Sequence, residues 1–337
     1  MPQARTKTTG EEGTRMQVNW EEARAEYEEA LLLSPDDVYT LNNLGYVLTQ
    51  LGLNREAAAL FRRVFELRPD YALAYNNLGN VHLNLGDLTE AAAQYRLAVV
   101  ADKTYPMPHR NLALLSYLMG RLDESIEEYR RYFELASDDA EDADARFNLG
   151  VALEKSGRVD EAVEEYEKAI GCNPQFAKAL NNLGLIWLER GEHAKAASYF
   201  EQALSIDADW TLARYNLGLC HFARGDAERA IAEFERVRAA EPHHLQAASN
   251  LGVMYTSVQR FDEAISLFQE LIEMHEGQPV LHFNLGFACK GKGLNREAAR
   301  EFQRVLELEP DGSPRAERAA RALQSAQAEI ALDANIM

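Results

Sequence analysis

The chain has 337 residues, of which 47% are hydrophobic and 26% are charged, and this is the composition of a globular protein that is long enough to bury a large core. Its 54 acidic residues outnumber its 35 basic ones, so the formal net charge at pH 7 is −19. Such a charge repels a phosphate backbone and an anionic membrane surface, which argues against a protein that binds nucleic acid or membranes.

The spacing of the cysteines and the lack of long apolar segments indicate in which cellular compartment the protein is expected. Cys172, Cys220 and Cys289 lie far apart and form no CxxC pair, so neither a disulfide framework nor a thiolate zinc site is indicated. The basic residues near the N-terminus are not followed by an apolar segment, and no stretch approaches the roughly 18 apolar residues of a transmembrane helix. We therefore expect a cytoplasmic protein with no membrane insertion.

An internal repeat organises most of the chain. The tripeptide Asn-Leu-Gly occurs seven times and Asn-Leu-Ala once at the same place of the repeat. Their first residues are Asn43, Asn77, Asn111, Asn148, Asn182, Asn216, Asn250 and Asn284. Neighbouring copies are 34 residues apart, except that the interval from 111 to 148 is 37 residues and contains an insertion of three. Stacked repeats extend one domain, so the length of the chain does not imply several domains.

Other positions recur with the same period. All units but one carry a glycine after the tripeptide, which supplies the left-handed backbone conformation that ends a helix, and Gln259 takes its place in the seventh unit. A small residue recurs in the second half of each unit, and an aromatic residue follows it four positions later. The aromatic residues are Phe61, Tyr95, Tyr129, Tyr166, Phe200, Phe234, Phe268 and Phe302. This pattern predicts two antiparallel helices of about 12–15 residues in each unit.

These positions together strongly resemble the tetratricopeptide repeat (TPR) family. The resemblance implies an all-α TPR solenoid, a right-handed superhelix of antiparallel helix pairs. It also implies that the first helices line a concave groove and that the second helices form the convex side. Because one unit is too small to bury its own apolar face, neighbouring units must stack.

In chain order we expect a disordered tail over residues 1–18, a half repeat over 19–37, eight repeats over 38–312, and a capping helix with a tail over 313–337. The repeats are bounded at 38–71, 72–105, 106–142, 143–176, 177–210, 211–244, 245–278 and 279–312. The half repeat has the pattern of a second helix, and Pro314 can begin the capping helix.

The third repeat departs from the pattern. Tyr132 replaces a smaller side chain, and the acidic segment 137–144 carries the insertion. An aromatic ring at this place demands extra room between the third and fourth repeats, and the insertion can supply it. The acidic segment either docks a basic partner or is a solvated spacer, and charge runs in loops are more often spacers.

The eight recurrent asparagines are the main candidates for a binding site, because the TPR resemblance places them on the groove side. Asparagine stabilises a helix less than alanine by a few tenths of a kcal/mol, so its recurrence needs a reason. A carboxamide both donates and accepts hydrogen bonds, and can therefore bind the C=O and N–H of an extended peptide without demanding a sequence. With helices ~10 Å apart the ladder would span about 70 Å. Duplication of an ancestral unit that carried asparagine is the alternative explanation, which the near-identical segments 52–58 and 293–299 favour.

The ladder is similar to the asparagine ladder in the TPR superhelix of O-linked N-acetylglucosamine transferases. Positions one turn further along the first helices are mostly apolar and favour a ligand with hydrophobic side chains. From these positions we include Tyr46, Asn80, Leu185, Leu219 and Phe287 among the candidate peptide-binding residues.

The carboxylate clamp of TPR co-chaperones needs a basic residue just before each ladder asparagine. Arg110 is the only one in the sequence, so that clamp is incomplete.

The remaining polar residues suggest no catalytic chemistry. His82, His109, His221 and His282 occupy places where the repeat has large core residues, and the adjacent histidines at 243 and 244 have no third ligand nearby. The sequence contains no glycine-rich phosphate loop, GxSxG or HExxH motif. We therefore predict no catalytic residues, no metal and no cofactor.

These observations predict a non-catalytic adaptor or scaffold that holds an extended segment of a partner protein in the groove through the asparagine ladder. Two alternatives stay open. One is a regulatory or substrate-recruiting subunit of an enzyme, such as a glycosyltransferase, whose catalytic domain is on another chain. The other is a self-assembling structural scaffold. The sequence leaves the partner and the oligomeric state open.

Overall fold

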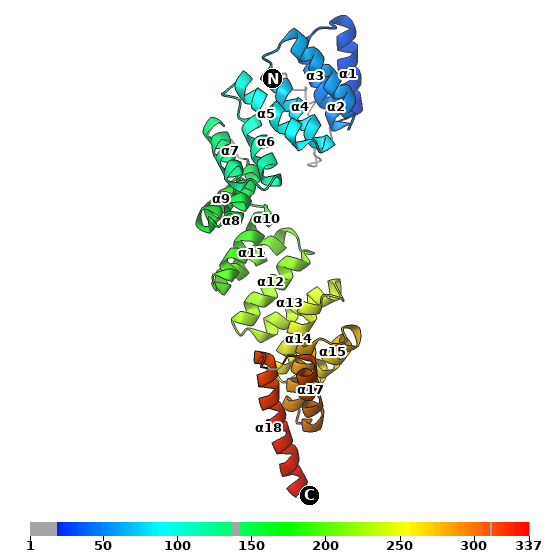
Figure 1. Cartoon of the computed structure of the whole chain (residues 1–337), viewed down its shortest axis with the longest axis vertical. Helices are drawn as coiled ribbons and strands as arrows, with labels where there is room; N and C mark the ends of the chain where they lie inside the picture. The colour runs from blue at the N-terminus through cyan, green and yellow to red at the C-terminus, as the bar shows by residue number, and fades with distance from the viewer. Residues whose placement is uncertain (1–18, 137–141, 311, 337) are drawn as a thin grey trace, which may run out of the picture. The chain divides into compact units, whose positions relative to one another are not determined.

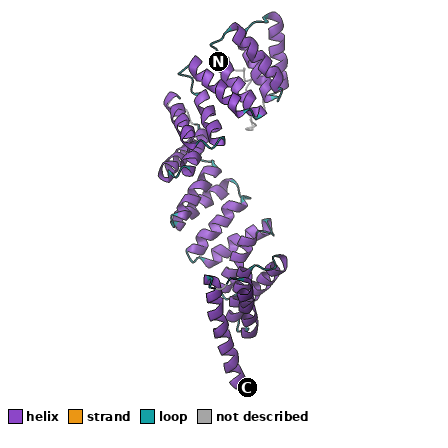
Figure 2. Cartoon of the chain, viewed as in Figure 1, coloured by secondary structure: helices purple, strands orange, loops and turns teal. Residues whose placement is uncertain are grey.

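The computed structural model describes residues 19–136, 142–310 and 312–336, and within them the chain forms eighteen α-helices and no strand (Figure 2). The expected disordered tail over 1–18, and residues 137–141 of the acidic segment, lie outside the described residues. Consecutive helices pack in pairs, so the all-α TPR array predicted from the sequence is confirmed.

The helices follow one another with short connections. Their bounds are α1 Trp20–Leu33, α2 Val38–Gln50, α3 Asn54–Leu67, α4 Ala72–Leu85, α5 Leu88–Ala101, α6 Met107–Leu118, α7 Leu122–Leu135, α8 Ala143–Lys155, α9 Val159–Cys172, α10 Ala177–Glu189, α11 His193–Ile206, α12 Thr211–Ala223, α13 Ala227–Ala240, α14 Leu245–Ser257, α15 Phe261–Met274, α16 Pro279–Gly291, α17 Asn295–Leu308 and α18 Pro314–Ile336.

The chain divides into two compact units. The first comprises Met1–Glu141 and Val151–Arg158, and the second comprises Asp142–Gly150 and Val159–Met337. Within each unit most helices pack beside the next helix along the chain, as the succession of colours in Figure 1 shows. In the second unit α18 packs on α17 and so covers the last helix pair. Each unit therefore has a core that continues from one helix pair to the next.

A missing side chain on each first helix lets its partner helix approach closely. A Cβ atom on Gly79 would lie 2.4 Å from Cε1 of Tyr95, and a Cβ atom on Gly184 would lie 2.6 Å from Cε1 of Phe200. The same contact recurs in seven helix pairs, at Gly45 and Phe61, Gly79 and Tyr95, Gly150 and Tyr166, Gly184 and Phe200, Gly218 and Phe234, Gly252 and Phe268, and Gly286 and Phe302. These rings have no measurable exposure, so the recurrent aromatic residue is the centre of each pair.

The pair α6 and α7 replaces this contact. Its first helix carries Ala113 in place of glycine, and Ser125 takes the place of the recurrent alanine of the second helix. The Ser125 hydroxyl donates to the carbonyl oxygen of Ala113 at 2.7 Å, and Tyr129 is still buried. Tyr132, the other departure of this repeat, is also buried and packs edge-on against Phe133. The pair therefore keeps its buried aromatic residue although the glycine and the alanine of the contact are both replaced.

The turn between the helices of each pair uses the left-handed conformation that the recurrent glycine predicts. Gly191 has a φ of 76°, and the corresponding glycines of the other pairs are similar. Gln259 keeps this conformation with a φ of 64°, and it is the only non-glycine residue of the described chain with a positive φ. Backbone geometry is thus preserved where the residue changes.

We expect the substitution Gly184→Ala to lower the free energy of unfolding by about 1–3 kcal/mol, because the new methyl group overlaps the buried Phe200 ring. The matched control is Gly171→Ala in α9, where nothing lies within 4 Å of the added Cβ. That change should raise stability by roughly 0.5–1 kcal/mol, because alanine favours the helix. Urea unfolding followed by circular dichroism compares the two, and an equal effect of both substitutions would contradict the packing role of Gly184.

Candidate functional site

The eight ladder asparagines lie on the first helices of successive pairs, three in the first unit and five in the second. Asn77 and Asn216 are buried, and the other six are half-buried. A carboxamide carries one acceptor oxygen and two N–H donors, so its neighbours decide what each side chain has left for a ligand.

In the first unit the ladder amides bond to the preceding first helix. The Asn77 Nδ2 donates to Asn42 Oδ1 at 3.1 Å, and the Asn111 Nδ2 donates to Asn76 Oδ1 at 2.9 Å. Asn42 and Asn76 each stand one residue before a ladder asparagine and are themselves buried. Each bond therefore joins the first helices of neighbouring pairs. The sequence analysis did not find this role, although adjacent asparagines at this place in successive repeats are a signal that could have shown it.

The second unit uses other partners. The Asn182 Nδ2 donates to the Tyr166 hydroxyl at 3.1 Å, and the Asn250 Nδ2 donates to the Tyr215 hydroxyl at 3.4 Å. The Nδ2 atom of Asn216 is buried and has no partner among the described residues. Asn148 and Asn284 form no side-chain hydrogen bond within the part of the chain that the structure describes. The amides of the second unit are therefore only partly used within the protein.

The apolar candidates differ in how much surface they offer. Tyr46 and Phe287 are 40% and 38% exposed. Leu185 and Leu219 are half-buried and pack against the core clusters of their helix pairs. Asn80 is occupied, because its Oδ1 accepts a hydrogen bond from the Tyr95 hydroxyl at 2.8 Å and from the Asn111 side chain at 3.3 Å. Tyr46 and Phe287 thus have the most surface for contact with a ligand.

A part-buried polar contact between the two helices of a pair recurs in several helix pairs and was not found from the sequence. The Nδ1 atoms of His109 and His282 lie 2.6 and 2.7 Å from carboxylates 19 residues further on. In two more helix pairs an arginine takes the place of the histidine and forms the same contact with a glutamate. The four pairs are His109 and Glu128, Arg146 and Glu165, Arg214 and Glu233, and His282 and Glu301. The recurrence of a basic residue and a glutamate at this one separation is the signal that was available.

The histidines expected in the core are placed there in three of four cases. His109, His221 and His282 are buried, and His82 is half-buried.

Burial raises the pKa of the Cys220 and Cys289 thiols to about 11, which keeps both protonated and poorly nucleophilic at neutral pH. Within the described residues no three His, Cys, Asp or Glu side chains gather as metal ligands would, and none of the described helices is long and apolar enough to cross a membrane.

Comparison with known families agrees with this architecture. Tetratricopeptide repeat models match residues 50–106 and 110–175, 188–251, and 244–276, and a further TPR model matches residues 19–52. Together these segments cover more than half of the chain, and they include the half repeat that begins with α1. The chain belongs to the tetratricopeptide repeat family. No curated protein matches it.

Solved structures with the same fold are numerous and distant in sequence. The C-terminal part of a TPR repeat-containing protein from Cytophaga hutchinsonii is 16% identical with a TM-score of 0.59, over 73% of this chain and 98% of that one. The type IV pilus biogenesis factor PilW is 18% identical with a TM-score of 0.51, over 61% and 94%. YrrB, a TPR protein with an unusual peptide-binding site, is 24% identical with a TM-score of 0.47, over 56% and 95%. The first two likenesses support the fold.

We predict that Asn77→Ala lowers the free energy of unfolding by about 1–3 kcal/mol, because it leaves the buried Asn42 Oδ1 without its donor. Asn216→Ala is the matched control, since it removes a buried amide whose Nδ2 has no partner. That substitution should leave stability unchanged or raise it, because alanine is the better helix former. Urea midpoints of the two variants measure the difference, and a loss of the same size in both would show that the amide bond between helices contributes nothing.

Proposed function

We propose that the protein is a non-catalytic adaptor that binds an extended segment of a partner protein along its first helices. The observation that carries this proposal is the incomplete use of the ladder amides in the second unit. Asn148 and Asn284 are half-buried and form no side-chain hydrogen bond with described residues. Neither side chain has a buried atom without a partner, so both amides stay open to solvent and available to a ligand. A bound peptide backbone would supply partners with matched donors and acceptors.

The chemistry around the ladder favours an apolar ligand rather than a charged one. Phe287, 38% exposed, packs edge-on against Phe283 and Phe302 and offers a fixed aromatic surface. Tyr46 in the first unit packs in the same way against Trp20. Rigid aromatic side chains provide contact area at a small entropy cost. The likeness of the ladder to that of O-linked N-acetylglucosamine transferases stays a prediction, as does the cytoplasmic location.

We expect a variant with alanine at Asn148, Asn182, Asn250 and Asn284 to stay folded and to lose partner binding. All four residues lie in the second unit, and each contributes about 1 kcal/mol if it makes a hydrogen bond to the ligand. The combined loss is several orders of magnitude in affinity, since 1.4 kcal/mol corresponds to a factor of ten. A pull-down from native lysate with wild type and variant identifies the captured proteins, and peptides tiled across them measure the affinities.

The control variant carries alanine at Gln202, Gln269 and Gln303, which are exposed amides on second helices of the same unit. It should bind the peptides as wild type does. If the ladder variant retains the affinity of wild type for a peptide that wild type binds, the asparagines serve only the packing of the helices and the proposal fails.

A further inference from the structure

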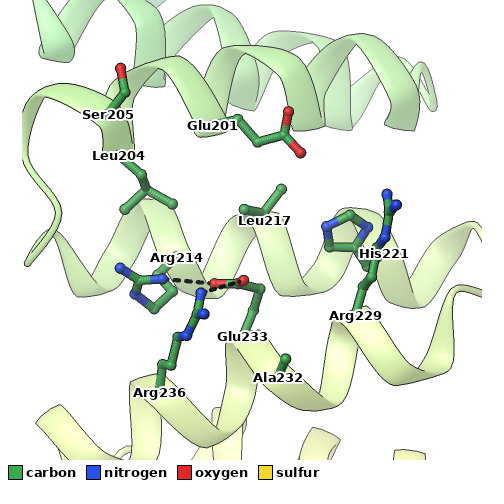
Figure 3. Close-up of a pocket in the computed structure, with 10 residues that line it drawn as sticks. All are labelled: Glu201, Leu204, Ser205, Arg214, Leu217, His221, Arg229, Ala232, Glu233 and Arg236. Carbon is green, nitrogen blue, oxygen red and sulfur yellow. Dashed lines mark hydrogen bonds and ion pairs between the residues drawn. The ribbon is translucent and has the colours of Figure 1, made fainter.

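A cavity with both charged and apolar lining residues lies between three consecutive helices of the second unit, α11, α12 and α13 (Figure 3). Its volume is 570 Å³, which is enough for a small organic molecule. Two of these helices are second helices, so the lining comes largely from residues away from the asparagine ladder. The cavity is therefore independent of the proposed peptide site.

The lining carries more positive than negative groups in a protein of net charge −19. Arg214, Arg229 and Arg236 line it together with two carboxylates, those of Glu201 and Glu233. The Glu233 carboxylate is shared, since Oε2 lies 2.9 Å from Arg214 Nη1 and Oε1 lies 3.0 Å from Arg236 Nη1 (Figure 3). One carboxylate cannot neutralise two guanidinium groups, so this cluster keeps a net positive charge.

Arg229 is the most unusual residue of the lining. It forms no ion pair with any residue that the structure describes, and it stands in the first turn of α13, where the helix dipole disfavours a cation. The corresponding residue is glutamate in six other repeats, at Glu56, Glu90, Glu124, Glu161, Glu263 and Glu297. The fifth repeat carries Lys195 at this place, and that cation lies over the Trp187 ring. Arg229 is exposed and has no such partner, so its guanidinium group is available to a ligand.

A buried histidine lines the same cavity. The His221 side chain is 5% exposed and lines the cavity, as does Arg229 (Figure 3). The Nδ1 atom of His221 is buried without a hydrogen-bond partner among the described residues. The Asp226 carboxylate lies 3.8 Å from Nδ1, which is too far for a hydrogen bond. The equivalent His82 has the same arrangement, because its Nδ1 atom is also buried without a hydrogen-bond partner and lies 3.6 Å from the Asp87 carboxylate. The nitrogen of His221 that is left for a ligand is therefore Nε2.

We propose that this cavity binds a phosphate group. Guanidinium groups reach it from Arg229 and Arg236, and the imidazole of His221 adds a donor from a different helix. Guanidinium pairs well with phosphate and with carboxylate, but donors that converge from several directions suit the three terminal oxygens of a phosphate better than the planar pair of a carboxylate. Glu201, which faces the cavity from α11 in Figure 3, can accept a hydrogen bond from a hydroxyl or amide of the molecule that carries the phosphate.

Two substitutions test the proposal with little risk to folding, because each restores a residue that other repeats carry at the same place. Arg229→Glu installs the glutamate of six repeats, and His221→Leu installs the leucine found at Leu48 and Leu153. The control is Arg296→Glu, which makes the same change of charge at an exposed arginine in the first turn of α17, outside the cavity. It separates a local effect from the change in overall charge.

Isothermal titration calorimetry of the full chain with inorganic phosphate, at constant ionic strength in a buffer without phosphate, gives the affinity. We expect binding by wild type and by Arg296→Glu, and at least a tenfold loss in Arg229→Glu and in His221→Leu. Glycerol 3-phosphate and N-acetyl phosphoserine amide then distinguish a free phosphate ester from a phosphorylated side chain, and tighter binding of either than of inorganic phosphate supports the proposal. It is overturned if wild type binds none of the three, or if Arg229→Glu and Arg296→Glu bind equally well.

Discussion

The contact between a first-helix glycine and the aromatic ring of its partner helix fixes the geometry on which the rest of the structure depends. With no Cβ at Gly184, the Phe200 ring lies against the backbone and is fully shielded from solvent. Because the two helices meet at this point in nearly every pair, residues around it meet in the same register each time. His109 pairs with Glu128, and Arg214 pairs with Glu233. Each basic residue lies 19 residues before its carboxylate partner, and this constant separation follows from that register.

The asparagines have a structural role in one unit and, under the proposed function, a binding role in the other. In the first unit their amides join neighbouring first helices, as between Asn111 and Asn76, which gives a structural reason to keep asparagine after a duplication. The Asn111 Nδ2 donates to both Asn76 and Asn80, so its oxygen is the atom left for other partners, whereas Asn77 donates once and keeps its second N–H. In the second unit Asn148 makes no such bond within the described residues, and its amide stays available to the ligand that we propose. Packing and recognition can thus be divided between different members of one series.

Periodic features of this protein could be predicted from its sequence, and features that depend on a single contact could not. The 34-residue period, the turn glycine and the aromatic position lead directly to helix pairs, because each reports a backbone or packing need that every repeat shares. The bond from Asn77 to Asn42 depends on side chains 35 residues apart and on the stacking of two pairs. The cavity beside Arg229 depends on three helices at once, although the exchange of glutamate for arginine was visible in the aligned repeats.

The basic and acidic partners that lie 19 residues apart belong to the same helix pair, whereas the amide bonds cross from one pair to the next. A unit that is duplicated or moved along the gene carries the first kind of interaction with it intact. An amide bond between two helix pairs is kept only if the new neighbouring pair carries a side chain that can accept or donate the hydrogen bond. Residues inside a helix pair can therefore be substituted with little effect on the neighbouring pairs. The order of the pairs along the chain is constrained by the polar residues at their junctions. We expect amino-acid substitutions to accumulate most slowly at these junction residues.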